Sequence, residues 1–334
     1  MRPAFVCVLA LTAVACGSDT GFSSDVLVHG EPNPKEVEPP IQTDAVNQVT
    51  TPEVDILFVV DNSCSMELNQ RLLAENFPSF LEYFTGSGLD YHIGVVSTDM
   101  DNPLESGRLQ TVGGERWIDD ETIGAPAVFE QMTLLGIEGS GDEMGIGATY
   151  TALELLEGGH NKGFRREDAA LHVVVVSDED DQTDSDLISL SEFIRWMDSQ
   201  TLSLDDTTFS SVVGPPEGCP EAWAPGLRYL DVTAAVGGVA WSICADDWSV
   251  LLEELGLQAA GMKREYVLSQ LPVPGTIEVF VIDAETGSRY AFFETADWEY
   301  DQLRNSITFL EFVPGPLDSV EIRYEVLGMG TVVD

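Results

Sequence analysis

The stretch VDILFVVDNSCSM, from Val54 to Met66, decides the fold that the sequence predicts. Its first half is a continuous apolar run rich in β-branched residues, which is typical of a strand buried on both faces. The Asp, Asn and Ser residues that follow are typical of a turn into a helix. Apolar residues at helical spacing then predict a helix over residues 66–84, with a kink or break at Pro78.

Two more apolar runs, at residues 92–96 and 171–176, predict further buried strands. Strands that alternate with helices predict an α/β fold, with a mostly parallel sheet and helices on both faces. Ligands in such folds bind beyond the carboxyl ends of the strands. The remaining predicted elements are helices at 127–136, 144–156, 187–197 and 247–257, and short strands at 209–213 and 241–243.

Asp61, Ser63 and Ser65 form a D-x-S-x-S motif directly after the first predicted strand. Mg²⁺ prefers six oxygen ligands, and two hydroxyls on alternate residues of one turn can face a single ion. With the segments YHIGVVSTD and LHVVVVSDEDD, this motif resembles the von Willebrand factor A domain family over residues 53–260. The resemblance implies a Rossmann-like fold and a metal-ion-dependent adhesion site, in which Asp61 and Asp178 bind the waters of the metal.

The same family resemblance implies one more hydroxyl ligand from a loop before a helix. Ser140 is the candidate, with Thr98 as the alternative. If Asp142 or Glu143 turned inward instead, the metal would be held more tightly but would be less electrophilic. Cys64, inside the motif, is expected to pack as a small buried thiol.

A metal with few anionic ligands attracts an external carboxylate, which in this family comes from a partner protein. The expected function is therefore metal-dependent adhesion with Mg²⁺, or with Mn²⁺ or Ca²⁺ instead, and no enzymatic activity. Two alternatives are a structural or sensory envelope protein in which the metal stabilises the fold, and a metal-dependent hydrolase.

The first residues predict export. A basic start and an apolar run from Ala4 to Ala15 are typical of a signal peptide, here residues 1–15. The sequence Ala-Val-Ala-Cys that ends at Cys16 resembles a bacterial lipoprotein box, which implies a lipid on Cys16. The proline-rich stretch 16–52 is predicted to be a tether. Together these features predict a lipid-anchored protein of the bacterial cell envelope, at the outer membrane.

The rest of the chain divides into a predicted von Willebrand A-like domain over 53–271 and a β-rich region over 272–334. The latter is either a small antiparallel domain or a hairpin extension of the main sheet. Because the chain is exported, Cys219 and Cys244 are expected to form a disulfide, which closes a loop of 26 residues.

Composition and spacing argue against nucleic-acid binding, a structural zinc site and an EF-hand. The chain has 58 acidic and 15 basic side chains, a net charge of −43, so it repels the phosphate backbone of nucleic acids. Few histidines and no C-x-x-C exclude a structural zinc site of the usual kind. The acidic run from Asp178 to Asp186 lacks the glycine and the final glutamate of an EF-hand. It is expected to be a solvated helix entry, or else a second cation site.

Overall fold

The computed structural model describes residues 39–48, 53–85, 88–201, 206–315 and 317–327. The predicted signal peptide (1–15), Cys16 and most of the predicted tether lie outside these residues. Below, the α/β body means residues 53–262, and the β-rich part means residues 39–48 and 263–327.

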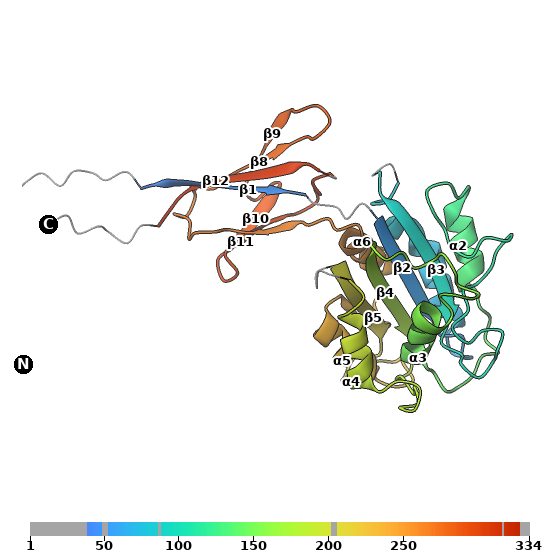
Figure 1. Cartoon of the computed structure of the whole chain (residues 1–334). Coiled ribbons are helices and arrows are strands. Elements are labelled where there is room, and N and C mark those ends of the chain that lie inside the picture. Colours follow the sequence, from blue (N-terminus) through green and yellow to red (C-terminus); the bar gives the residue numbers. More distant parts are fainter. Residues whose placement is uncertain (1–38, 49–52, 86–87, 202–205, 316, 328–334) are drawn as a thin grey trace, which may run out of the picture. The chain divides into compact units, whose positions relative to one another are not determined.

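The α/β body is built on one parallel sheet with the strand order β3-β2-β4-β5-β6. Helices cover both of its faces (Figure 1), which is the α/β architecture that the alternating pattern predicts. The strands are β2 (Glu53–Val60), β3 (Asp90–Ser97), β4 (Ala170–Ser177), β5 (Thr207–Val213) and β6 (Ala240–Ser242). The helical elements are α1 (Glu67–Leu81), α2 (Ala125–Thr133), α3 (Gly145–Tyr150), the π-helical turn η1 (Thr151–Leu155), α4 (Leu190–Met197), α5 (Leu227–Val236) and α6 (Trp248–Ala259).

Strand β2 is apolar throughout its second half because its side chains alternate between two separate cores. Ile56, Phe58 and Val60 pack in the core that contains residues of α1, α2 and α6. Leu57 and Val59 pack in the core that contains residues of α3, α4 and α5. All five side chains are fully buried, and each such burial contributes roughly 1.5–3 kcal/mol. This fixes the end of β2, and therefore the turn that follows it.

Helix α1 continues through Pro78 to Leu81, so the predicted break is wrong. Pro78 is exposed and lies in the last turn of the helix. Phe77 and Phe80, on the buried side, contact Phe58 of β2 with ring centroids 6.4 and 5.3 Å apart. Aromatic packing of this kind offsets the backbone hydrogen bond that a proline cannot donate.

The β-rich part contains two antiparallel sheets, with the strand orders β1-β12-β8-β9 and β10-β11-β7. They share one core, to which Trp298, Phe309 and Tyr324 contribute the largest side chains. The strands are β1 (Ile41–Asn47), β7 (Glu265–Val267), β8 (Glu278–Ile282), β9 (Arg289–Phe292), β10 (Trp298–Asp301), β11 (Ser306–Phe309) and β12 (Ser319–Glu325).

Two predicted boundaries are corrected by this arrangement. Strand β1 lies inside the predicted tether (16–52), yet it pairs with β12 along all seven of its residues. Strand β7 lies inside the predicted von Willebrand A-like domain (53–271), yet it pairs with β11. Both are strands of the β-rich part, whose sequence therefore brackets the α/β body.

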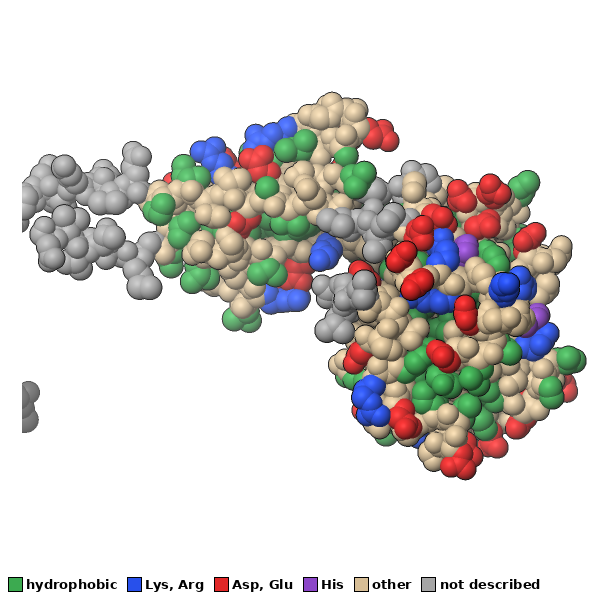
Figure 2. Space-filling view, viewed as in Figure 1, with side chains coloured by type: hydrophobic (Ala, Val, Ile, Leu, Met, Phe, Trp, Pro, Cys, Tyr) green, Lys and Arg blue, Asp and Glu red, His purple; other side chains and the backbone are tan. Residues whose placement is uncertain are grey.

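The surface of the α/β body carries acidic side chains in many places, as Figure 2 shows for one face. This distribution agrees with the strongly negative composition. No helix in the described part of the chain has the length and apolarity needed to span a bilayer.

Candidate metal centre

The candidate site lies where three neighbouring strands end. Val60 of β2 is in register with Ser97 of β3 and with Val176 of β4. Asp61, Thr98 and Asp178, which directly follow these strands, therefore meet at one edge of the sheet. This is the carboxyl edge, where the alternating fold predicts a ligand site.

Asp61 is the buried centre of this cluster. Its Oδ1 accepts a hydrogen bond from the backbone N–H of Ser63 at 2.7 Å, and its Oδ2 accepts one from the Ser177 hydroxyl at 2.6 Å. Burial raises the pKa of Asp61, although these hydrogen bonds oppose the rise. The hydroxyl oxygens of Ser63 and Ser65 are 3.2 Å apart. The structure thus brings together the three residues of the D-x-S-x-S motif as the sequence predicts.

Asp178 is the acidic residue that joins Asp61 from β4. It is buried, and its Oδ1 has no hydrogen-bond partner. Burial, and then the charge of Asp61, raise the pKa of Asp178 to about 6. The Ser65 hydroxyl and the backbone N–H of Trp223 face the carboxylate and partly lower this pKa. An acid with a raised pKa and an unpaired buried oxygen is typical of a position that meets a cation.

Glu143 is the residue of this site that the motif did not single out. Its side chain is fully buried, the Thr98 hydroxyl donates a hydrogen bond to its Oε2, and its Oε1 has no partner. Burial, followed by the charge of Asp61, raises the pKa of Glu143 to about 9. An isolated bridge between Asp99 and Glu143, and a 3.2 Å hydrogen bond from Met144 N–H to the Thr98 carbonyl, fix this position.

Ser140, the candidate third hydroxyl, has other partners. Its hydroxyl donates to Asp101 Oδ2 at 2.9 Å, and its backbone N–H donates to Asp99 Oδ2 at 3.2 Å. Thr98, the alternative candidate, is the hydroxyl that borders the buried acids through Glu143. The Ser140 hydroxyl thus bonds to Asp101, whereas the Thr98 hydroxyl borders the buried acids, and Glu143 turns inward.

Cys64 is exposed, so the expectation of a buried thiol is wrong. The turn buries the side chains of Asp61 and Ser63. The side chains of Cys64 and Ser65, which follow them, are exposed to solvent. The site is also supported from behind by Gln70, which donates to the carbonyls of Asp61 and Gly136, both at 2.9 Å. No local sequence signal marks Gln70, because its role depends on a contact 66 residues away.

The acidic run after β4 is exposed at Asp184 and Asp186, as expected of a solvated helix entry, but Asp181 within it has a structural role. Asp181 is buried, and its Oδ2 accepts a hydrogen bond from Arg228 Nε at 3.0 Å. Its Oδ1 accepts hydrogen bonds from the Thr183 hydroxyl at 2.7 Å and from Ile146 N–H at 3.0 Å. This carboxylate anchors α3 and α5, so the expectation of a solvated side chain is wrong for Asp181.

The acids of the candidate metal centre have no basic partner among the described residues. Among the ion pairs of the described residues, none involves Asp61, Glu143, Asp178 or Glu179. Burial, Asp61 and Asp178 also raise the pKa of Glu179. Buried carboxylates are stable only when they are paired, metal-bound or protonated. Hydroxyl and carboxylate oxygens are the ligands of Mg²⁺, Mn²⁺ and Ca²⁺, so the donor set fits such an ion.

Cys219 and Cys244 are joined by a disulfide. Glu221 lies close to both sulfur atoms, but sulfurs that are joined to each other are not available as thiolate ligands. This group is therefore part of the frame of the loop before α5 rather than a metal site.

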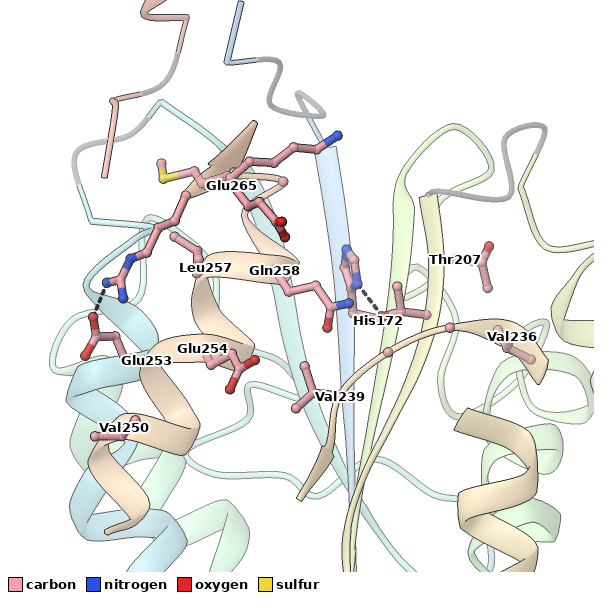
Figure 3. A pocket seen from close by; sticks show the side chains of 17 residues that line it. His172, Thr207, Val236, Val239, Val250, Glu253, Glu254, Leu257, Gln258 and Glu265 are labelled. Carbon is pink, nitrogen blue, oxygen red and sulfur yellow. Dashed lines mark hydrogen bonds and ion pairs between the residues drawn. The ribbon is translucent and has the colours of Figure 1, made fainter. Parts of the chain in front are cut away.

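A cavity of about 730 Å³ opens near the opposite, amino-terminal edge of the sheet (Figure 3). His172 and Thr208 meet in its wall, with His172 Nδ1 and Thr208 Oγ1 2.7 Å apart. Burial lowers the pKa of His172 to about 4, so this histidine is neutral at physiological pH. None of the acids of the candidate metal centre lines this cavity.

No protein-family model and no curated protein sequence matches this chain. Among solved structures, the chain is similar to the pilus adhesin SpaC from Lactobacillus rhamnosus GG in its open conformation. The TM-score is 0.43 at 10% identity, over 89% of this chain and 42% of the adhesin. It is also similar to proximal thread matrix protein 1 from the mussel byssus, with a TM-score of 0.43 at 11% identity. That match covers 68% of this chain and 52% of the matrix protein. The chain thus spans about half or less of either protein, and at this similarity neither carries an argument about function.

Proposed function

We propose that the chain is a von Willebrand factor A-type adhesion protein that captures a carboxylate of a partner protein through a divalent cation. Mg²⁺ is the first candidate, and Mn²⁺ and Ca²⁺ are the alternatives. The observation that carries the proposal is a pair of buried carboxylate oxygens without partners, Glu143 Oε1 and Asp178 Oδ1, on either side of Asp61. No ion pair among the described residues includes these acids, so each is stable either when protonated or beside a bound cation.

The hydroxyl and carboxylate groups of the site would have different roles around the ion. The hydroxyls of Ser63, Ser65 and Thr98 would hold the ion without neutralising it, while Asp61 and Asp178 would orient its water molecules. When bound, the ion supplies an electron-poor position for an external carboxylate. Glu143 adds a negative charge beside this position, so it would raise metal affinity and lower the affinity for the partner's carboxylate.

Calorimetric titration of Mg²⁺ and Mn²⁺ into the metal-free full chain tests this proposal. We expect saturable binding at one site, which is lost in Asp61→Ala and in the double variant Ser63→Ala/Ser65→Ala, with unchanged circular dichroism. Asp186→Asn, an exposed acid of the same region, is the matched control and should bind like the parent. Absence of binding in the parent chain would refute the metal site.

A second candidate function is a structural metal, which the inward Glu143 favours because it weakens the electrophile. The two functions differ in their response to EDTA. An adhesion role predicts that partner binding is lost while the fold is retained. A structural role predicts that the native circular dichroism is lost at the same EDTA concentration.

We also propose that the protein is anchored to the bacterial cell envelope, at the outer membrane, by a lipid on Cys16. The lipoprotein-type sequence that ends at Cys16 supports this proposal. Metabolic labelling with a palmitate analogue should mark the parent chain but not Cys16→Ser. Equal labelling of both would contradict the anchor.

A further inference from the structure

A loop next to the candidate metal centre is fixed at several points and carries one exposed aromatic side chain. Gly226 N–H donates to the Gly214 carbonyl at 2.9 Å, and Ala224 N–H donates to the Asp178 carbonyl at 3.0 Å. A Cβ atom on Gly214 would lie 2.3 Å from the carbonyl oxygen of Ala224, so only glycine permits this approach. The disulfide Cys219–Cys244 closes the other side.

Trp223 stands on this loop with 79% of its surface exposed. Its backbone N–H faces the carboxylate of Asp178, so the residue borders the candidate metal centre. Isolated exposed apolar residues are common and need no function. A tryptophan on a fixed loop at the edge of a ligand site is different, because tryptophan supplies much of the binding energy in protein interfaces.

The acidic side chains at this edge determine what Trp223 would recognise: Glu179 directly follows Asp178, and Glu221 lies two residues before Trp223. Asp142, Glu179 and Glu221 are acidic, and none of them takes part in an ion pair among the described residues. Asp142 lies close enough to Glu179 for its charge to raise the pKa of that residue. Arg228, the basic side chain nearby, is already bonded to Asp181 at 3.0 Å. A partner that offered only a carboxylate would be repelled by this rim.

We infer that Trp223 is a specificity-determining residue, which selects partner segments in which the captured carboxylate is flanked by lysine or arginine. The cation would lie on the indole face, within the field of Glu179 and Asp142, while the adjacent carboxylate enters the metal centre. Cation–π contacts at exposed sites contribute about 0.5–1 kcal/mol, which corresponds to a factor of about two to five in affinity. This inference rests on the proposed capture of a carboxylate.

Three immobilised peptides test the inference by biolayer interferometry with the full chain in Mg²⁺. The first carries a glutamate flanked by two lysines, the second the same glutamate flanked by alanines, and the third has glutamine in place of glutamate between the lysines. We expect the first to bind about two- to fivefold more tightly than the second, and the third not to bind. In Trp223→Ala this preference should fall to about one, and in Trp223→Phe it should be intermediate.

Tyr290→Ala, which removes an exposed aromatic side chain from β9, is the matched control and should keep the preference. The inference is overturned if Trp223→Ala keeps the preference, if the parent binds the first two peptides equally, or if Trp223→Ala no longer binds Mg²⁺. Equal binding of the glutamate and glutamine peptides would instead refute carboxylate capture, so failure of the proposed function is distinguishable. The same immobilised peptides report on the inference and on carboxylate capture, and Mg²⁺ titration of each variant accompanies them.

Discussion

Glu143 places an ionisable oxygen near Asp61, on the loop from which the family resemblance implies a hydroxyl. It shares its surroundings with Asp61 and is bonded to Thr98, so three polar groups from three segments meet there. A hydroxyl would leave the charge of the centre unchanged, whereas a carboxylate makes the charge depend on pH. Binding of the proposed metal should therefore release protons, and its affinity should increase as the pH rises.

The stability of the metal-free protein should depend on pH through Glu143. Burial raises its pKa from an ordinary value of 4.5 to about 9. An acid whose folded-state pKa is raised stabilises the fold fully below its unfolded pKa, and this stabilisation is lost as the pH rises through the folded pKa. We expect the Tm in EDTA to fall between pH 4.5 and about 9, and Glu143→Gln to flatten this fall, as measured by scanning calorimetry. Parallel profiles for the two proteins would exclude Glu143 as the source.

Asp178→Asn should separate stability from metal binding. The substitution removes a charge that burial and Asp61 disfavour, so the metal-free protein should become more stable while Mg²⁺ binding weakens at least tenfold. Each kcal/mol gained would raise the Tm by roughly 2–4 °C for a body of this size. Thermal unfolding in EDTA and titration calorimetry measure the two effects. A variant that is less stable than the parent would show that Asp178 is structural.

Cys64 allows the metal to be located directly. With Cys7 and Cys16 replaced by serine and the disulfide intact, Cys64 is the remaining free thiol in the sequence. A nitroxide on this exposed thiol should lose most of its electron spin resonance amplitude when Mn²⁺ binds between Ser63 and Ser65. The same label in the Asp178→Asn background should respond only at higher Mn²⁺ concentration. Full amplitude at saturating Mn²⁺ would place the ion elsewhere.

At the scale of single elements, the sequence predicts the strands and helices whose hydrophobic pattern lies within the element itself. Strands β2, β3 and β4 are apolar runs buried on both faces, and Asp61 and Asp178 follow them directly, so their meeting could be predicted. Helix α5 was missed because it begins directly after a stretch rich in glycine and proline.

The elements and contacts that could not be predicted depend on partners far along the chain. Strand β1 is largely exposed and is defined by its ladder with β12, about 280 residues away. Glu143 is likewise turned inward by its bridge to Asp99, which no local pattern in the sequence marks. Ser140, three residues earlier, also carries an oxygen that can bind a metal, so the residue types alone do not show which side chain turns inward.

The disulfide Cys219–Cys244 is the element that fixes the loop of Trp223. Replacing both cysteines by serine should lower the free energy of unfolding by about 3 kcal/mol in the chain-entropy treatment of a loop of this length. Mg²⁺ affinity should change less than twofold, because Asp178 is held by β4 rather than by the disulfide. Urea unfolding and titration calorimetry measure the two quantities. Loss of Mg²⁺ binding would show that the loop shapes the metal centre itself.

At the scale of the whole molecule, the α/β body is an insertion in the sequence of the β-rich part. Along the sequence, β1 comes first, the strands of the parallel sheet follow, and β7 to β12 come last. The two parts have separate apolar cores, since the core of Trp298 and Tyr324 contains no residue of the parallel sheet. Their folding should therefore be separable by the choice of starting residue.

A chain that starts at residue 39 should unfold like the full chain, whereas one that starts at residue 53 should lose stability in its β-rich part alone. The second chain lacks β1, and β12 then loses a ladder of seven residues and becomes an exposed edge. Scanning calorimetry should show the shift in only one transition, and Mg²⁺ binding by the α/β body should be retained. Limited proteolysis should cut first near β12, because unpaired edges open most easily. If the two truncated chains were equally stable, the ladder between β1 and β12 would contribute nothing to the stability of the β-rich part.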